Sequence, residues 1–293
     1  MKPAPFKYIA ARSVDEAVAL KAEHGTEAWF LAGGQSLMPA MNFRLAQPAV
    51  LIDINSVAAC DGVSVLDGTV SIGALTRYRT LERESAIATL APLIAEALPH
   101  IAHPQIRNRA TLGGNLSHAD PASELPAIML ALGARMRARS QAGERWIEAR
   151  TFFVGALATS LEADEMLVEV QFAAIRPGSG TAFMEIARRR GDFAIMGVAA
   201  MLTLGNDGLC ADARLAYCGA GDGAMLATEA AAGLVGGSVS DGDIAAAAAQ
   251  AAQEVDPFGS IHASRDYQRH LAGVLTGRAL KTARARALAG RTS

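Results

Sequence analysis

The sequence predicts an α+β fold in two domains, and three observations lead to this expectation. The chain has 293 residues, which is long for one compact core. Strand patterns and helix patterns fall in separate stretches, which is typical of α+β proteins. A cluster of proline, glycine and serine at Arg176–Gly180 marks a boundary. We therefore expect one domain over residues 1–177 and a second over residues 178–290.

The N-terminal stretch is predicted to form a helix and then a buried strand. Ser13 and Glu16 have the spacing of a capping box, in which the serine oxygen accepts from the backbone N–H of residue 16. A helix over Val14–His24 follows, and Gly25 ends it. The apolar run Ala28–Ala32 then predicts a strand, which leads directly into a pair of glycines.

The rest of the first domain mixes a hairpin, strands and helices. Asp67-Gly68 supplies a two-residue turn, so the flanking segments Val63–Leu66 and Thr69–Ile72 are predicted to pair. Few apolar residues recur between Pro99 and His118, and we expect this stretch to be irregular. The other predicted elements are a strand over Val50–Ile54, helices over Thr76–Glu84, Ala86–Leu98 and Pro121–Leu132, and a strand-rich region over Ala134–Phe172.

The second domain is predicted to hold a small sheet followed by helices. A turn at Asn206-Asp207-Gly208 separates the last two of three strand candidates. The strands are expected over Ala182–Arg188, Gly197–Leu204 and Ala213–Cys218. The helices are expected over Ala224–Leu234, Asp241–Val255 and Arg265–Leu288.

Composition argues against several classes of protein. Lys and Arg number 27 against 29 Asp and Glu, so a net charge of −2 favours neither nucleic acid nor an anionic membrane. The three cysteines form no CxxC pair, which fits a reducing cytoplasm, and they are too few for an iron–sulfur cluster. We expect no signal peptide and no membrane span, because no apolar run approaches ~20 residues.

Two glycine-rich segments carry the strongest functional signal. They are Ala32-Gly-Gly-Gln-Ser36, directly after a predicted strand, and Thr111-Leu-Gly-Gly-Asn115. Glycine has no Cβ, so its backbone can adopt a positive φ and come within contact distance of a ligand. Successive exposed N–H groups form a concavity that binds anions. Two such loops that converge would hold both phosphates of a dinucleotide, whereas either one alone is more often an ordinary turn.

With these segments in view, the chain resembles the medium, FAD-binding subunits of the molybdenum hydroxylases. The matching stretches are Phe30–Ser56, Ile101–Ala127 and Arg188–Met201, and the resemblance covers nearly the whole chain. It implies a vanillyl-alcohol-oxidase-type (PCMH-type) FAD-binding domain. It also implies a small C-terminal domain with a three-stranded antiparallel sheet and helices.

The resemblance also implies which residues bind FAD, and it implies no catalytic or metal-binding residue. Related chains often have a lysine near the flavin at the positions of Met184 and Glu185, and this chain lacks it. Glu124 stands where the family often has aspartate, and Phe193 would cover one face of the flavin ring. The implied FAD-binding residues are Leu31, Ala32, Gly33, Gly34, Gln35, Ser36, Leu37, Met38, Ile101, Thr111, Leu112, Gly113, Gly114, Asn115, Glu124, Leu167 and Phe193.

The family's chemistry implies an electron-transfer role. A large partner subunit would oxidise substrate at a molybdenum–pterin cofactor, and a small partner subunit would carry electrons through two [2Fe–2S] clusters to FAD. The expected assembly is a heterotrimer, or a dimer of heterotrimers, acting on an N-heterocycle, a purine, an aldehyde or CO. Two alternatives stay open: a self-contained flavin-dependent oxidoreductase, and a non-catalytic nucleotide-binding module.

Four further motifs have plainer explanations. Gly219-Ala-Gly-Asp-Gly-Ala224 matches a dinucleotide fingerprint, but no clear second parallel strand follows it. Ser117, His118 and Asp120 have the residue types of a catalytic triad but are more simply polar loop residues. His100 and His103 lack a third metal ligand. The basic run Arg188–Arg190 is most often a solvated face, and a contact with an iron–sulfur partner is the alternative.

Overall fold

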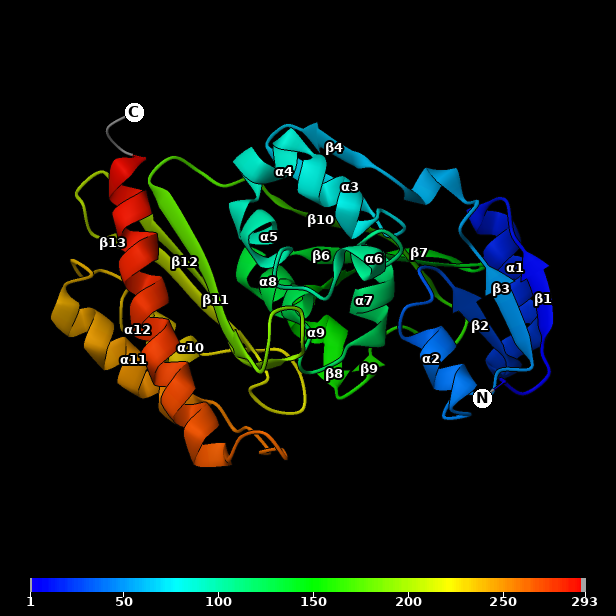
Figure 1. The fold of residues 1–293 in the computed structure, drawn as a ribbon. Helices are drawn as coiled ribbons and strands as arrows, with labels where there is room; N and C mark the ends of the chain where they lie inside the picture. The colour runs from blue at the N-terminus through cyan, green and yellow to red at the C-terminus, as the bar shows by residue number, and fades with distance from the viewer. Residues whose placement is uncertain (1, 291–293) are drawn as a thin grey trace.

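A computed structural model describes residues 2–290 and shows three larger sheets and one two-stranded sheet in an elongated molecule (Figure 1). The first sheet is parallel, in the order β1-β3-β2, with Ala28 and Lys7 both paired to Val50. Its strands are β1 (Lys7–Ala10), β2 (Ala28–Leu31) and β3 (Val50–Asp53), and the associated helices are α1 (Val14–His24), η1 (Gly25–Glu27), α2 (Leu37–Asn42) and η2 (Ala58–Cys60).

The second sheet is antiparallel, in the order β4-β5-β10-β6-β7, and it forms the centre of the molecule. Its strands are β4 (Val63–Leu66), β5 (Thr69–Gly73), β6 (Arg135–Ser140), β7 (Gly143–Glu148) and β10 (Met166–Ala173). A short pair, β8 (Phe153–Gly155) and β9 (Ala158–Thr159), lies beside it. The helices of this part are α3 (Tyr78–Arg83), α4 (Ser85–Leu90), α5 (Pro92–Ala97), α6 (Pro104–Arg107), α7 (Leu112–His118), α8 (Glu124–Leu132) and α9 (Ala149–Phe152).

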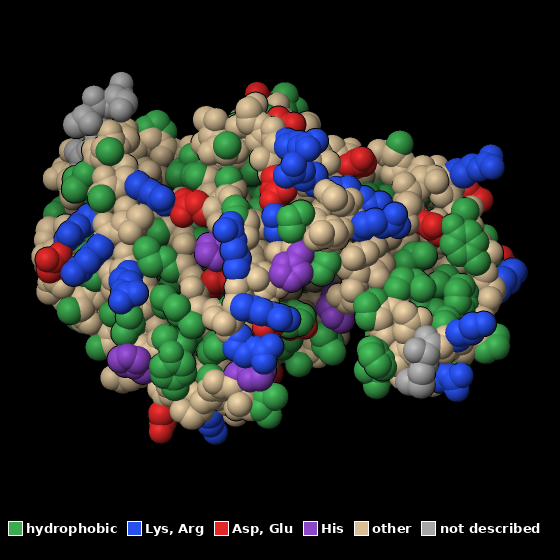
Figure 2. All heavy atoms as spheres, in the orientation of Figure 1, with side chains coloured by type: hydrophobic (Ala, Val, Ile, Leu, Met, Phe, Trp, Pro, Cys, Tyr) green, Lys and Arg blue, Asp and Glu red, His purple; other side chains and the backbone are tan. Residues whose placement is uncertain are grey.

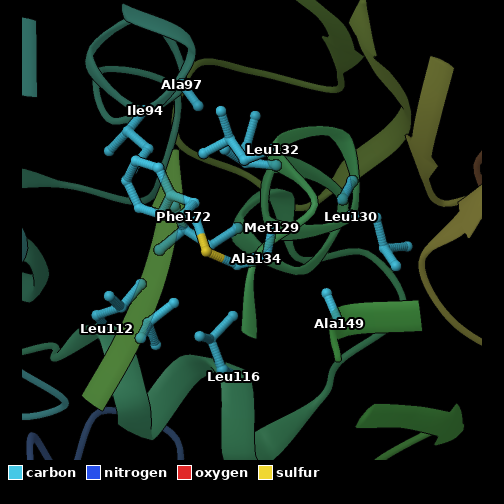
Figure 3. Close-up of a cluster of buried hydrophobic side chains, with 14 of the residues drawn as sticks. Ile94, Ala97, Leu112, Leu116, Met129, Leu130, Leu132, Ala134, Ala149 and Phe172 are labelled. Atoms are coloured by element: carbon cyan, nitrogen blue, oxygen red, sulfur yellow. The ribbon is translucent and has the colours of Figure 1, made fainter. Parts of the chain in front are cut away.

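The largest buried core joins the central sheet to the helices around it. Phe172 of β10 meets Ile94 and Ala97 of α5, and Met129 of α8 packs beside them (Figure 3). Every residue of α8 is buried, because the helix is covered on both sides. This core also contains Ala199 and Cys218 from the third sheet, so it continues into the C-terminal part.

The third sheet is antiparallel, in the order β11-β12-β13-β14. Helix α12 packs along β11 and β12 on one face, and α8 packs against β12 and β13 on the other (Figure 1). The strands are β11 (Ser179–Ala187), β12 (Ala194–Leu204), β13 (Cys210–Cys218) and β14 (Met225–Leu226), and the helices are α10 (Thr228–Ala232), α11 (Asp241–Glu254) and α12 (Arg265–Ala289).

Two sequence-based expectations about local structure are wrong. The stretch from Pro99 to His118 is not irregular, because it contains α6 and α7. The segment Ala224–Leu234 is not one helix. Its first part pairs with β13 as β14, which adds a two-residue fourth strand to the three expected ones, and only α10 is helical.

Smaller differences concern where elements begin and end. The helix expected over Ala86–Leu98 is interrupted at Ala91, the residue before Pro92, because proline disfavours helical backbone at the residue before it. The helix expected from Pro121 begins only at Glu124. Strand β1 and helix α2 were not expected at all. Within residues 2–290, no helix has the length and apolar character that crossing a bilayer requires.

Candidate functional site

A cavity of about 610 Å³ lies where the N-terminal sheet, the central helices and the β11–β12 hairpin meet. Figure 2 shows a notch in the surface between the lobe of β1–β3 on the right and the central part of the molecule. Fourteen of the seventeen predicted FAD-binding residues line the cavity: Ala32, Gly33, Gly34, Gln35, Ser36, Leu37, Ile101, Thr111, Gly113, Gly114, Asn115, Glu124, Leu167 and Phe193. The cavity lining does not include Leu31, Met38 or Leu112.

The first glycine loop connects β2 to α2 and presents unpaired amides. Gly34 has a φ of +71°, which favours glycine. A Cβ at Gly34 would lie 3.2 Å from side-chain atoms of both Leu31 and Met38, so these two residues pack behind the loop. The backbone N–H groups of residues 34–37 donate to no acceptor within residues 2–290. This loop therefore has the properties of an anion-binding concavity.

The second glycine loop is the first turn of helix α7, and its amides are already paired. Thr111 is the N-cap and accepts from the N–H of Gly114 at 3.2 Å. The N–H of Leu112 donates to the Thr76 carbonyl, and the N–H of Gly113 donates to the Ala74 carbonyl. The loop thus offers a ligand a close backbone surface and a helix N-terminus rather than free N–H groups.

The structure brings the two loops into contact. A Cβ at Gly33 would lie 2.5 Å from the carbonyl oxygen of Arg109, and one at Gly114 would lie 3.7 Å from Cβ of Ala32. The first loop approaches the Arg109 carbonyl this closely only because residue 33 is glycine, whereas the distance at Gly114 is an ordinary van der Waals contact. The convergence that the sequence suggested therefore exists.

Arg77 and Asn55 connect the two loops, and neither residue was among those predicted from the sequence. Arg77 donates to the Arg109 carbonyl and to the side-chain oxygen of Asn55. Asn55 in turn donates through Nδ2 to the Ala32 carbonyl at 2.9 Å. We call these two residues the Arg77–Asn55 clasp. Their partners are distant in sequence, so no local pattern could have revealed the role.

Ile101, Glu124, Leu167 and Phe193 are four of the predicted residues that line the cavity. Glu124 begins α8 and is 5% exposed. Burial, and next the charge of Glu185, raises the pKa of Glu124 to about 8. Ile101 and Leu167 are buried, whereas Phe193 is 64% exposed at the mouth of the cavity.

The cavity is also lined by Lys21, Trp29 and Glu165, which were not among the predicted residues. The ammonium group of Lys21 donates to the carbonyl of Gly25 at 2.9 Å and to that of Ala28 at 2.5 Å. Its burial lowers the pKa of Lys21. Glu165 is held by Arg145, whose hydrogen bond lowers the pKa of Glu165.

The weaker motifs have structural explanations. The fingerprint-like segment at Gly219 follows β13, which is antiparallel to its neighbours, whereas a dinucleotide fingerprint needs parallel strands. His100 pairs with Glu185 at 3.3 Å. Among the described residues no group of three His, Cys, Asp or Glu side chains has a metal-binding arrangement. Arg188 and Arg189 pair with Asp192.

The site's chemistry fits a dinucleotide such as FAD. Its volume falls in the usual range for small-molecule sites. Unpaired amides lie on one side of the loop contact, and on the other side the Oδ1 atom of Asn115 is buried without a partner. An unpaired buried acceptor of this kind is suited to a ligand hydroxyl. The fold and the site together define a flavin-binding class of protein.

Comparisons with known proteins identify the family. Residues 4–173 match the FAD binding domain in molybdopterin dehydrogenase, and residues 181–283 match the CO dehydrogenase flavoprotein C-terminal domain. The chain therefore belongs to the FAD-binding flavoprotein family of the molybdopterin dehydrogenases. The predicted family, the α+β fold class and FAD as the cofactor are confirmed.

Several relatives match over nearly their whole length. The chain is 43% identical to the 6-hydroxypseudooxynicotine dehydrogenase complex subunit alpha of Paenarthrobacter nicotinovorans, covering 98% of this chain and 97% of that protein. A solved carbon monoxide dehydrogenase from Hydrogenophaga pseudoflava has a TM-score of 0.95 at 37% identity, covering 98% and 99%. Quinoline 2-oxidoreductase from Pseudomonas putida 86 has a TM-score of 0.93 at 37% identity, covering 98% and 100%.

Proposed function

We propose that the chain binds FAD in this cavity and serves as the electron-transfer subunit of a molybdenum-containing hydroxylase. It would receive electrons from the [2Fe–2S] clusters of a partner subunit and pass them to an external acceptor. The observation that carries the site assignment is the contact between the two glycine loops, where residues 34–37, whose amides are unpaired among the described residues, line the cavity.

In this proposal each part of the site has a defined task. The amides of residues 34–37 hold the diphosphate, and the N-terminus of α7 adds a favourable dipole. Asn115 accepts from a cofactor hydroxyl, and the buried side chains of Ile101 and Leu167 exclude water from the part of the cavity that they line. Bound FAD supplies the redox chemistry, whereas the protein supplies position and electrostatics. Leu31, Met38 and Leu112 support the loops from behind instead of lining the cavity.

The partners follow from the family. We propose a small iron–sulfur subunit and a large molybdopterin-binding subunit, in a heterotrimer or a dimer of heterotrimers in the cytoplasm. Relatives named for nicotine and caffeine oxidation favour an N-heterocycle as the substrate of the complex, with a purine, an aldehyde or CO as the other classes. Within this chain, we propose residues 1–177 and 178–290 as the two domains.

The purified chain and its co-purifying partners test the proposal. We expect a yellow protein with a flavin absorption spectrum and one FAD per chain, together with two partner chains that carry the iron–sulfur and molybdenum centres. The chain alone should not oxidise substrate. Turnover by the isolated chain would favour a self-contained oxidoreductase. A chain that stays colourless after addition of FAD would favour a nucleotide-binding module instead.

A further inference from the structure

Glu185 lies in a row of paired residues across the C-terminal sheet. It pairs with Gly197 of β12, and Gly197 pairs with Cys218 of β13. A Cβ at Gly197 would lie 2.6 Å from Sγ of Cys218 and 3.4 Å from Cβ of Glu185. Glycine at this position therefore lets the two flanking side chains approach each other on the sheet face that α8 covers.

The carboxyl group of Glu185 is buried but has one partner that reaches solvent. Its side chain is 4% exposed, and Oε1 lies 3.3 Å from Nδ1 of His100. Its Oε2 is buried and makes no hydrogen bond with the described residues. The His100 side chain is 41% exposed. A negative charge on Glu185 therefore has the His100 imidazole beside it as a hydrogen-bond partner, whereas no such partner is seen for Glu124 among the described residues.

Glu124 is the second buried carboxyl group in this region, and it lines the cavity. Glu124 interacts electrostatically with four titratable groups. They are Glu185 of β11, Asp120 before α8, Tyr78 of α3 and Cys218 of β13. Burial raises the pKa of Tyr78 and of Cys218, so both stay uncharged. None of the four is a cation, and two buried carboxylates in one apolar region disfavour each other's charge.

We propose that Glu124 and Glu185 carry one negative charge between them, held on Glu185 beside His100, so that Glu124 keeps its proton. Glu124 then presents an O–H donor to an electron-rich atom of the cofactor, rather than a carboxylate that accepts from a cofactor hydroxyl. Glu185 is a positioning residue that acts through Glu124. This inference rests on the proposed function, because it assigns the cavity to FAD.

Infrared spectroscopy of the full chain without FAD tests the protonation directly. We expect a protonated carboxyl band that is present at pH 7, disappears as the pH rises towards about 10, and is missing in Glu124→Gln. In Glu185→Gln, and likewise in Glu185→Ala, the band should disappear at lower pH than in the wild type. Glu144→Gln, a matched change at an exposed glutamate of β7, should leave it unchanged. A band absent at pH 7, or one that titrates in both Glu185 variants at the same pH as in the wild type, overturns the inference.

FAD affinity gives the second readout. If binding needs the protonated form of Glu124, affinity should fall about tenfold between pH 7 and pH 9, because only about a tenth of the chains then carry the proton. Glu124→Gln keeps an N–H donor, so its affinity should vary little over this range. A wild-type affinity that is flat or rises with pH contradicts the inference. Absence of FAD binding at every pH overturns the proposed function, while the infrared titration still decides the charge state.

Discussion

At the scale of single residues, the site depends on the absence of a side chain at two glycines and on one arginine. Gly33 has no side chain, and this lets the first loop touch the Arg109 carbonyl, whereas a Cβ at Gly114 would lie 2.7 Å from Oγ1 of Thr111 within its own loop. Arg77 then fixes that contact through the Arg109 carbonyl and Asn55. The two glycine segments were predicted because their signal is local. The clasp was not, because its residues are brought together only by the folded chain.

Substituting Gly33 by alanine should damage FAD binding. The new Cβ would lie 2.5 Å from the Arg109 carbonyl oxygen, which is backbone and moves only together with the second loop. Overpacking of this kind costs about 1–3 kcal/mol, so we expect FAD affinity to fall roughly tenfold or more. Gly223→Ala is the matched control, because a Cβ there meets nothing within 4 Å. Fluorescence titration with FAD measures both, and equal affinities would refute the role of the loop contact.

Arg77→Gln should separate the loops. Hydrogen bonds from a charged donor are each worth about 1.5–3 kcal/mol, and Arg77 makes one to each side of the contact. We expect FAD affinity to fall about tenfold or more, with partial recovery in Arg77→Lys. Arg79→Gln is the control, because among the described residues Arg79 pairs with Glu82 and does not line the cavity. The same titration decides the matter, and the prediction fails if both glutamine variants bind FAD equally well.

At the scale of elements, the sequence predicted helices well where their ends are set locally. Helix α1 has the expected bounds because Ser13 accepts from Glu16 and Gly25 ends the helix. Helix α7 was missed because its two glycines and several polar residues leave no helical pattern of apolar residues. Its first turn is held instead by carbonyls of Ala74 and Thr76, which lie far away in the sequence. The segment of β14 was misassigned because its pairing partner is β13, which a local pattern does not reveal.

Removing the cap of α7 should affect both stability and binding. Thr111→Val keeps the shape of the side chain but leaves the N–H of Gly114 without its acceptor. We expect a loss of about 0.5–2 kcal/mol in the free energy of unfolding, together with weaker FAD binding. Ser13→Ala removes the comparable cap of α1, outside the cavity lining. It should reduce stability in urea denaturation without changing FAD affinity, and a parallel loss of affinity would contradict this assignment.

At the scale of the whole molecule, the C-terminal part is firmly connected to the central helices near the cavity. Glu96 of α5 accepts from Arg286 of α12 at 2.6 Å and from the N–H of Phe183 of β11 at 3.2 Å. The N–H of Gly219 donates to the Pro121 carbonyl at 2.8 Å. The β11–β12 hairpin also lines the cavity with Asp192 and Phe193. Residues from both the N-terminal and the C-terminal part of the chain therefore line the cavity.

The FAD-free chain should lose stability as the pH rises. In the folded chain the pKa of Glu124 is about 8, against its ordinary value of 4.5. Between these values the folded state binds more protons than the unfolded state, so the free energy of unfolding falls from about pH 4.5 to about pH 8 and then levels off. Urea denaturation at pH 5, 6.5, 8 and 9 measures this. Glu124→Gln should flatten the profile, and a profile identical to that of the wild type would exclude Glu124 as its source.

The close contact of Gly33 with the Arg109 carbonyl has a consequence for how the chain acquires its cofactor. Contacts within the chain hold the two loops together, so no ligand is needed to bring the walls of the recess into place. Ligand entry then requires little ordering of the backbone, which favours fast capture and a small entropic penalty. We therefore expect newly synthesised chains to fold before they take up their cofactor.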